Sequence, residues 1–159
     1  QPLLEPVRQY DLDSYLQDIF YLTRPYPGIK ALLEGKRGLG VASAVLTNKP
    51  APLAQALMDA LFPGLLDEVA GKTPDSVSKP DPRSLTGLLE RMGVDRESCL
   101  YVGDSDVDMI TAQNAGIAAC AVTWGYQTRE ELSVFSPAWF AGSAEELLDI
   151  CRQLSADNK

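Results

Sequence analysis

The stretch CLYVGDSDVDMITAQNAG, residues 99–116, governs the interpretation of the whole chain. A short apolar run ends there in Gly-Asp, and carboxylates follow at alternating positions: Asp104, Asp106 and Asp108. Like charges at this spacing repel one another unless solvent or a cation relieves them. The stretch is therefore either a solvated acidic loop or a site that holds a metal ion.

Two kinds of metal site can be compared with this pattern. An EF-hand calcium loop has the same aspartate spacing, but it requires a glycine and a glutamate where this chain has Met109 and Ala115. Asp104 and Asp108, one helical turn apart, could instead offer oxygen ligands to Mg²⁺, which keeps several waters and accepts a substrate phosphate oxygen. Acidic residues that complement the helix dipole in a first turn are the alternative. The stretch alone does not separate these two interpretations.

Composition excludes several classes of function. The 159 residues carry a net charge of −8, which argues against a nucleic-acid or anionic-membrane partner, because phosphate backbones require a basic face. The chain has no histidine, so Ser-His-Asp and Cys-His nucleophile systems and histidine-ligated zinc are removed. No run approaches the roughly 18 apolar residues of a membrane span. Cys99, Cys120 and Cys151 lack metal-ligand spacing, and we expect a reducing cytoplasm.

Strand-like and helix-like segments alternate from residue 29 onward. Apolar runs of strand length occupy 41–47, 99–103, 118–124 and 138–142, and helical patterns occupy 52–62, 84–93, 106–115 and 143–154. Such alternation predicts an α/β fold with a doubly wound parallel sheet, covered by helices on both faces. We expect residues 25–159 to form this core.

Polar motifs follow the predicted strands, and ligands bind beyond the carboxyl ends of strands in such sheets. Thr47-Asn48-Lys49 could bind phosphate oxygens through a hydroxyl and backbone N–H groups, although a polar turn is the plainer interpretation. The prolines of the 78–82 loop would hold Lys79 in a fixed direction, although an ordinary surface lysine is also possible. We expect Thr47, Lys79 and Asp104 to converge on one edge of the sheet.

Together, the motifs resemble those of the haloacid dehalogenase superfamily, and specifically its phosphoglycolate-phosphatase-like branch. LTNKP (46–50) resembles that family's second motif, SKPDP (78–82) its third and YVGDSDVDM (101–109) its fourth. The segment NAGIAACAVTWGY (114–126) resembles the stretch that follows in that branch. The resemblance extends from about Arg24 to Leu154 and implies a haloacid-dehalogenase-like Rossmannoid core.

The resemblance implies a Mg²⁺-dependent phosphomonoesterase of a small phosphorylated metabolite. Thr47 would hydrogen-bond the transferring phosphoryl group with Asn48 beside it, and Lys79 would offset the charge of nucleophile and phosphate. Asp104 would hold Mg²⁺ directly, and Asp108 would hold it directly or through water. Thr47, Lys79 and Asp104 are thus the expected catalytic residues. These roles agree with the general physics of phosphoryl transfer, which depends on positioning and on neutralising charge.

The family's first motif, Asp-x-Asp-x-Thr after an apolar strand, has one candidate here, DLDSY at 11–15. Tyr15 replaces the threonine, the preceding residues are too polar for a central strand, and residues 12–20 carry a helical apolar stripe. We therefore expect residues 1–24 to be a cap-helix remnant and linker, without the first motif and most of the cap. The chain alone would then be inactive, unless Asp11 and Asp13 act as a degenerate first motif.

Absence of that motif would also affect the sheet. In the family's fold its strand lies between those ending at Thr47 and Asp104, whose backbone groups would lose partners. Residues 1–10, the DLDSY segment or a neighbouring chain would have to fill the position, so self-association is one expected route. Two alternatives to the phosphatase remain open: a non-catalytic remnant that binds phosphate, metal or a protein partner, and a phosphomutase of the same superfamily.

Overall fold

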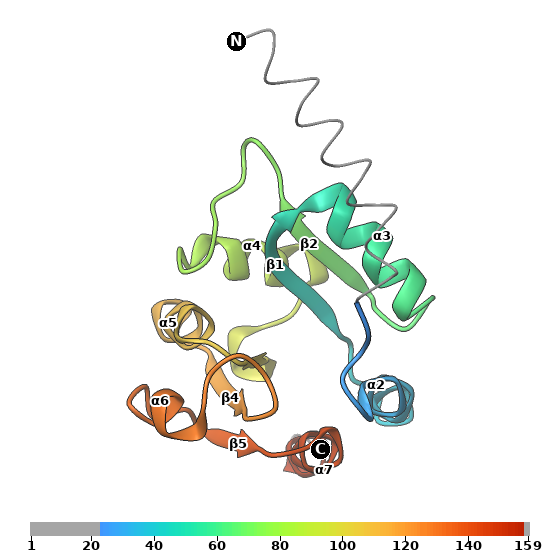
Figure 1. Cartoon of the computed structure of the whole chain (residues 1–159), viewed down its shortest axis with the longest axis vertical. Helices are drawn as coiled ribbons and strands as arrows, with labels where there is room; N and C mark the ends of the chain where they lie inside the picture. The colour runs from blue at the N-terminus through green and yellow to red at the C-terminus, as the bar shows by residue number, and fades with distance from the viewer. Residues whose placement is uncertain (1–22, 158–159) are drawn as a thin grey trace, which may run out of the picture.

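The structure is a computed structural model that describes residues 23–157 (Figure 1). Its elements are α2 (Ile29–Arg37), β1 (Ala44–Pro50), α3 (Ala51–Leu61), β2 (Glu68–Lys72), α4 (Arg83–Met92), a 3₁₀ turn (Arg96–Ser98), β3 (Leu100–Gly103), α5 (Asp106–Ala115), β4 (Ala118–Val122), α6 (Arg129–Ser133), β5 (Trp139–Ala141) and α7 (Ala144–Asp157). The predicted alternation of strands and helices is confirmed. The DLDSY segment and most of the predicted cap remnant lie outside the described residues. None of the helices described is long and apolar enough to cross a membrane.

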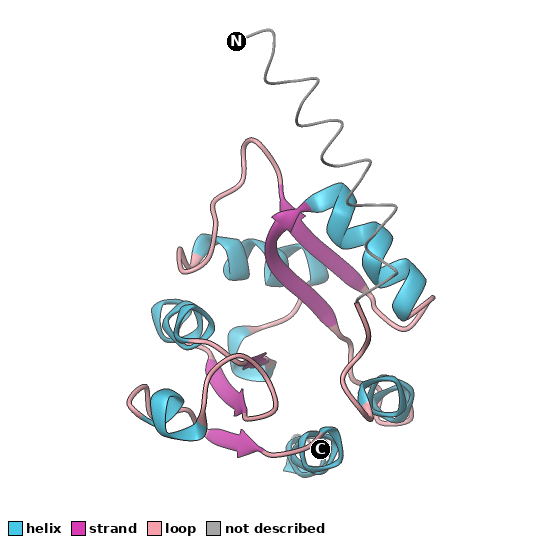
Figure 2. Ribbon diagram, viewed as in Figure 1, coloured by secondary structure: helices cyan, strands magenta, loops and turns pink. Residues whose placement is uncertain are grey.

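Within residues 23–157 the strands form two parallel sheets. β1 pairs with β2, and β4 lies between β3 and β5 in the second sheet. No ladder joins β1 to β3 in this part of the chain, and Figure 2 shows the two groups of strands apart. Val102 of β3 is 40% exposed, which is unusual for a parallel strand. This agrees with the expectation that β1 and β3 are not direct neighbours; completion of the sheet by self-association stays a prediction.

β4 shows why the second sheet is covered on both faces. Successive side chains of a strand point to opposite faces. Ala119 and Ala121 accordingly join the core cluster that contains α5, whereas Cys120 and Val122 join the cluster that contains α7. Leu46 of β1 also packs against the first cluster, so the two sheets share a core although no ladder joins them. The doubly wound α/β arrangement is therefore confirmed.

The helices α5 and α7 begin at polar caps that the sequence supplies. Ser105 caps α5, because its Oγ accepts the Asp108 N–H at 3.4 Å, and Gly116 ends that helix with a φ of 68°. At α7, Ser143 Oγ accepts the Glu146 N–H at 3.2 Å. The Glu146 carboxylate accepts the N–H of Gly142, one residue before the Ser143 N–H that a full capping box would use.

An ion pair between a buried lysine and an exposed aspartate fixes α2 to the loop before β2. Lys36 is 5% exposed, and its Nζ lies 2.9 Å from Asp67 Oδ2. The same oxygen accepts the Ser43 N–H at 2.7 Å. The Ser43 hydrogen bond, followed by the bond from Lys36, lowers the pKa of Asp67.

We expect Asp67→Asn to lower the free energy of unfolding by about 1–2 kcal/mol at neutral pH, because the buried Lys36 ammonium loses its carboxylate. The Asp67 side chain is 54% exposed, which limits the loss. Since its folded pKa lies below the unfolded 3.8, its contribution is present above that value and disappears as the pH falls through the folded pKa. Urea denaturation should show the difference shrinking below about pH 4.

Asp59→Asn is the matched control for this experiment. Asp59 is an exposed carboxylate whose Oδ1 accepts a hydrogen bond from Gln55 at 2.9 Å, and no ion pair within residues 23–157 involves it. We expect it to change stability by less than about 0.5 kcal/mol. A difference between Asp67→Asn and the wild type that stayed constant down to strongly acid pH would contradict the role given to the Asp67 charge.

Candidate active site

The acidic motif lies where β3 ends and α5 begins, and the carboxylate of Asp108 is its centre. Asp108 Oδ1 accepts hydrogen bonds from Lys79 Nζ at 2.6 Å and from Tyr101 OH at 3.2 Å. Its Oδ2 accepts from Ser105 Oγ at 2.8 Å and from the Asp104 N–H at 3.2 Å. Both oxygens of this buried carboxylate are therefore bonded to protein donors, and one donor is a cation.

The ionisation of this network follows from its contacts. Burial alone raises the pKa of Asp108, but the hydrogen bond and charge of Lys79, with the bonds from Ser105 and Asp104, outweigh burial and lower it. Burial, followed by the Asp108 charge, raises the pKa of Tyr101. At neutral pH, Asp108 is thus an ionised acceptor and the Tyr101 phenol is a donor.

Two glycines make room for the aspartates. A Cβ at Gly103 would lie 2.2 Å from Asp108 Cβ, and a Cβ at Gly125 would lie 2.1 Å from Asp104 Oδ2. Both distances are far shorter than any contact between real side-chain atoms. The Tyr126 N–H donates to the same Asp104 Oδ2 at 2.9 Å. The turn after β4 therefore holds one oxygen of Asp104 in place.

The loop that carries Lys79 is bonded to the end of β1. Asn48 Nδ2 donates to the Lys79 carbonyl at 3.2 Å, and Asn48 Oδ1 accepts the Lys79 N–H at 2.9 Å. The Lys79–Pro80 peptide bond is cis, and Asn114 of α5 donates to the Pro80 carbonyl at 3.2 Å. Thr47 precedes Asn48 on β1. Thr47, the Lys79 loop and the end of β3 lie in one region. We refer to this region as the carboxyl edge.

The carboxyl edge brings the residues singled out in the sequence to one end of the fold. Asp104 and Asp108 are linked by a hydrogen bond, Lys79 binds Asp108, and Asn48 binds Lys79. Asp106 lies apart from this network, and its carboxylate accepts the Val107 N–H at 2.9 Å. The individual catalytic and binding roles stay predictions.

Sequence reasoning missed three polar contributors to this region. Tyr101 and Ser105 bond Asp108, and Gln127 accepts the N–H of Asp106. Tyr101 carried one usable signal: it is a residue with a polar end inside a short, otherwise apolar strand. A buried phenol needs a hydrogen-bond partner, which points to a nearby acceptor.

The oxygen atoms that could bind Mg²⁺ are those of the Asp104 and Asp108 carboxylates. No donor among the described residues bonds Asp104 Oδ1, whereas both oxygens of Asp108 are already bonded. Residues 23–157 contain no group of three or more acidic, cysteine or histidine side chains placed around a common metal position. Mg²⁺ commonly binds one or two carboxylates and keeps several waters. The residues therefore fit a Mg²⁺ held directly by Asp104, with Asp108 acting through water.

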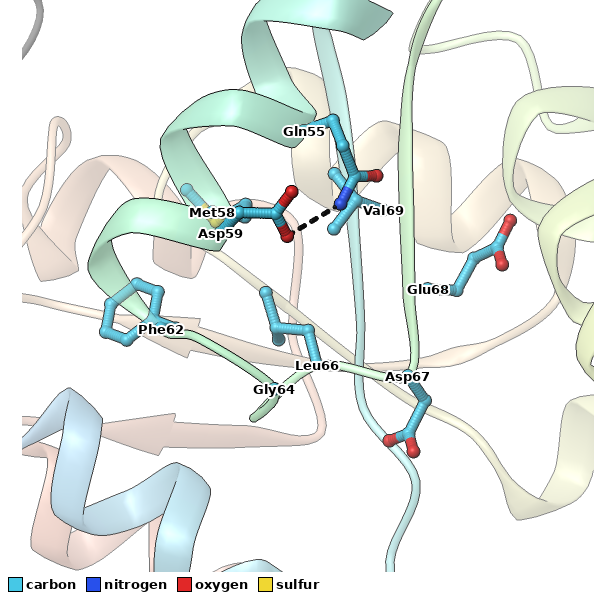
Figure 3. A pocket seen from close by; sticks show the side chains of 9 residues that line it. All are labelled: Gln55, Met58, Asp59, Phe62, Gly64, Leu66, Asp67, Glu68 and Val69. Atoms are coloured by element: carbon cyan, nitrogen blue, oxygen red, sulfur yellow. Dashed lines mark hydrogen bonds between the residues drawn. The ribbon is translucent and has the colours of Figure 1, made fainter.

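A surface hollow of about 240 Å³ lies elsewhere on the first sheet (Figure 3). It is lined by α3, by the loop that ends at Asp67 and by the start of β2, whereas Thr47 lies further along the paired β1. Asp59 projects there with Gln55 bonded to it. Its lining contains none of the residues predicted to act in catalysis. The hollow is therefore separate from the carboxyl edge.

Comparison with known proteins identifies the family. The profile described as haloacid dehalogenase-like hydrolase matches residues 2–116, and the chain belongs to this family. It is 35% identical over 155 residues to the N-acetylmuramic acid 6-phosphate phosphatase of Pseudomonas aeruginosa, covering 96% of this chain and 66% of that protein. It is 33% identical over 141 residues to the phosphoglycolate phosphatase of Vibrio parahaemolyticus, covering 87% and 61%.

Solved structures agree with this assignment. A crystal structure from Lactobacillus delbrueckii subsp. bulgaricus matches with a TM-score of 0.84 and 32% identity, covering 95% of this chain and 63% of that one. A predicted phosphoglycolate phosphatase from Haemophilus somnus matches with a TM-score of 0.78 and 30% identity, covering 86% and 61%. The predicted membership of the phosphoglycolate-phosphatase-like branch is confirmed. The chain spans at most 66% of the length of these relatives.

Proposed function

We propose that the protein carrying this chain is a Mg²⁺-dependent phosphomonoesterase that acts on a small phosphorylated metabolite. The observation that carries the proposal is the Lys79 ammonium, which is held 2.6 Å from Asp108 at the carboxyl edge, beside Asp104. Phosphoryl transfer depends on fixed positive charge near the equatorial oxygens of the transferring group. The phosphatase names of the relatives support the same class of reaction.

Each side chain at the carboxyl edge has a chemical part in this proposal. Lys79 has three N–H donors, of which Asp108 takes one, so two remain for a phosphate. Thr47 Oγ1 accepts the Lys49 N–H at 3.2 Å, which leaves its hydroxyl proton to donate to a phosphoryl oxygen. Asp104 would hold Mg²⁺, whose charge, when the ion is bound, neutralises phosphate oxygens. In this family the first motif supplies the nucleophile and the general acid, and we expect the 159-residue chain to lack that motif.

We also propose that the protein works in the cytoplasm. Cys99, Cys120 and Cys151 are all free thiols, and Cys120 is buried. Burial raises the pKa of Cys120 to about 12, so this thiol is unreactive at neutral pH. Free cysteines support a reducing cytoplasm.

The proposed function is tested by measuring phosphate release from three substrates: phosphoglycolate, N-acetylmuramic acid 6-phosphate and an aryl phosphate. The full-length gene product, with Mg²⁺, should hydrolyse at least one of them. Lys79→Ala should lower kcat/KM by roughly 10³-fold, because a positioned charge that stabilises the transition state is lost. Lys30→Ala, an exposed lysine of α2, is the control and should leave kcat/KM unchanged.

Two results would contradict these expectations. Absence of phosphate release from every substrate would refute the phosphatase proposal. The 159-residue chain alone is expected to show little or no turnover, because removing a nucleophile costs many powers of ten in rate. Robust turnover that disappeared in Asp11→Asn would instead make DLDSY a degenerate first motif.

A further inference from the structure

Lys79 is hydrogen-bonded at both ends of the residue, and its backbone end is held by Asn48. The Asn48 amide binds the N–H and the carbonyl of Lys79 together, at 2.9 and 3.2 Å, as the backbone of a neighbouring strand would. Asn48 stands at the end of β1, where the ladder to β2 shifts its register between Leu46 and Pro50. The side-chain carbonyl oxygen of Asn48 therefore points toward the backbone of Lys79.

The ammonium end of Lys79 is held by Asp108, and Asp108 is held in turn by Tyr101. The Lys79 and Asp108 side chains are 14% and 9% exposed, and Tyr101 is 8% exposed. Hydrogen bonds to a charged group in such surroundings are stronger than those at the surface. Since Tyr101 OH and Lys79 Nζ bond the same oxygen, Asp108 Oδ1, the phenol fixes the position of that oxygen.

A lysine needs both restraints to act as a fixed charge. Its four-carbon stem carries about 2 kcal/mol of rotamer entropy, so a single contact leaves it a choice of directions. The Lys79 backbone and the Asp108 carboxylate that its ammonium bonds are both fixed. The ammonium is therefore restricted to one position. Preorganised charge of this kind favours phosphate binding because less order is lost on binding.

We propose that Asn48 and Tyr101 are positioning residues for the Lys79 ammonium. Asn48 acts on the Lys79 backbone, and Tyr101 acts on the Asp108 carboxylate. This gives Asn48 a role through Lys79 in place of direct contact with the substrate. The inference rests on the proposed function, because that function assigns Lys79 to the substrate phosphate.

The test combines ¹H–¹⁵N spectra of lysine ammonium groups with titration of inorganic phosphate in the presence of Mg²⁺, on the 159-residue chain. The Lys79 resonance is assigned by its loss in Lys79→Arg. In the phosphate-free protein, Asn48→Ala and Tyr101→Phe should broaden or shift this resonance, because the ammonium moves and exchanges faster with water. The Kd of inorganic phosphate should rise roughly tenfold in Asn48→Ala and roughly threefold in Tyr101→Phe.

Asn114→Ala is the matched control, because Asn114 bonds the carbonyl of Pro80, the residue next to Lys79. It should leave the resonance in place and the phosphate Kd within about twofold. The Tyr101→Phe variant keeps the aromatic ring and loses only a hydroxyl, so its fold is expected to persist even if Asn48→Ala does not fold.

Three results would overturn the positioning roles. The first is a Lys79 resonance that stays unchanged in the free Tyr101→Phe protein, and the second is an equal effect of Asn114→Ala. The third is weaker phosphate binding by Asn48→Ala with an unchanged resonance in the free protein, which would mean that Asn48 contacts phosphate directly. If the wild type bound no phosphate, the assignment of Lys79 to the substrate phosphate would fail, while the free-protein resonances would still decide the positioning roles.

Discussion

Gly103→Ala is expected to lower the free energy of unfolding by about 3 kcal/mol or more, because the new Cβ has no space. It would lie 2.2 Å from Asp108 Cβ and 2.6 Å from Asp108 Cγ. Asp108 cannot turn aside without breaking its bonds to Lys79 and Ser105. Nor can α5 move away easily, since Met109 beside it is 1% exposed in the core.

Gly87→Ala is the control for this substitution. Gly87 lies inside α4, and the nearest atom that its Cβ would meet is Arg91 Nη1 at 3.9 Å. Alanine in a helix interior is favoured over glycine, so this variant should be more stable by about 0.5–1 kcal/mol. Urea denaturation of both variants should therefore give shifts of opposite sign. Two shifts of the same sign and size would contradict the close approach of Asp108 to β3.

Much of the fold could be predicted from local pattern. The alternation of apolar strands and amphipathic helices is a property of neighbouring residues, and the helices at 51–61, 83–92 and 106–115 fall close to their predicted bounds. β1 differs: the prediction was 41–47, and the strand occupies 44–50. The Ser43 N–H binds the Asp67 carboxylate at 2.7 Å, so this residue belongs to a loop contact before the strand.

The contacts at the carboxyl edge could not be predicted in the same way. Lys79 lies 31 residues from Asn48 and 29 from Asp108, and a motif gives no distance across such separations. The spacing did indicate that Asp104 and Asp108 lie close together, and the Asp104 N–H bonds Asp108 Oδ2 at 3.2 Å, although Asp104 precedes α5 and is not part of the helix. Which oxygen of Asp108 faces Lys79, and which accepts the Asp104 N–H, depends on how α5 packs against β3. Gly103 shows most directly what local pattern cannot predict. Only the position of Asp108 in the folded structure shows that residue 103 has no room for a side chain.

Mg²⁺ is expected to raise the Tm of the chain, and Asp104→Asn is expected to abolish that response. A ligand that binds only the folded state at 100 times its Kd stabilises it by about 2.7 kcal/mol, or several degrees for a chain of this size. We expect Asp104 to supply the effect because its Oδ2 is held by the Tyr126 N–H, while Oδ1 has no donor within the described residues. An amide at this position keeps the shape and loses the charge.

The variants Asp106→Asn and Asp108→Asn test whether the response to Mg²⁺ depends on Asp104 specifically or on the negative charge of the motif in general. Asp106 lies in the same turn, but its carboxylate accepts the Val107 N–H, so Asp106→Asn should keep the full response to Mg²⁺. Asp108→Asn should weaken the response without abolishing it, since a group that acts through water contributes less than a direct ligand. Differential scanning calorimetry at increasing Mg²⁺ measures all four proteins. An undiminished Tm shift in Asp104→Asn would move the metal site away from the end of β3.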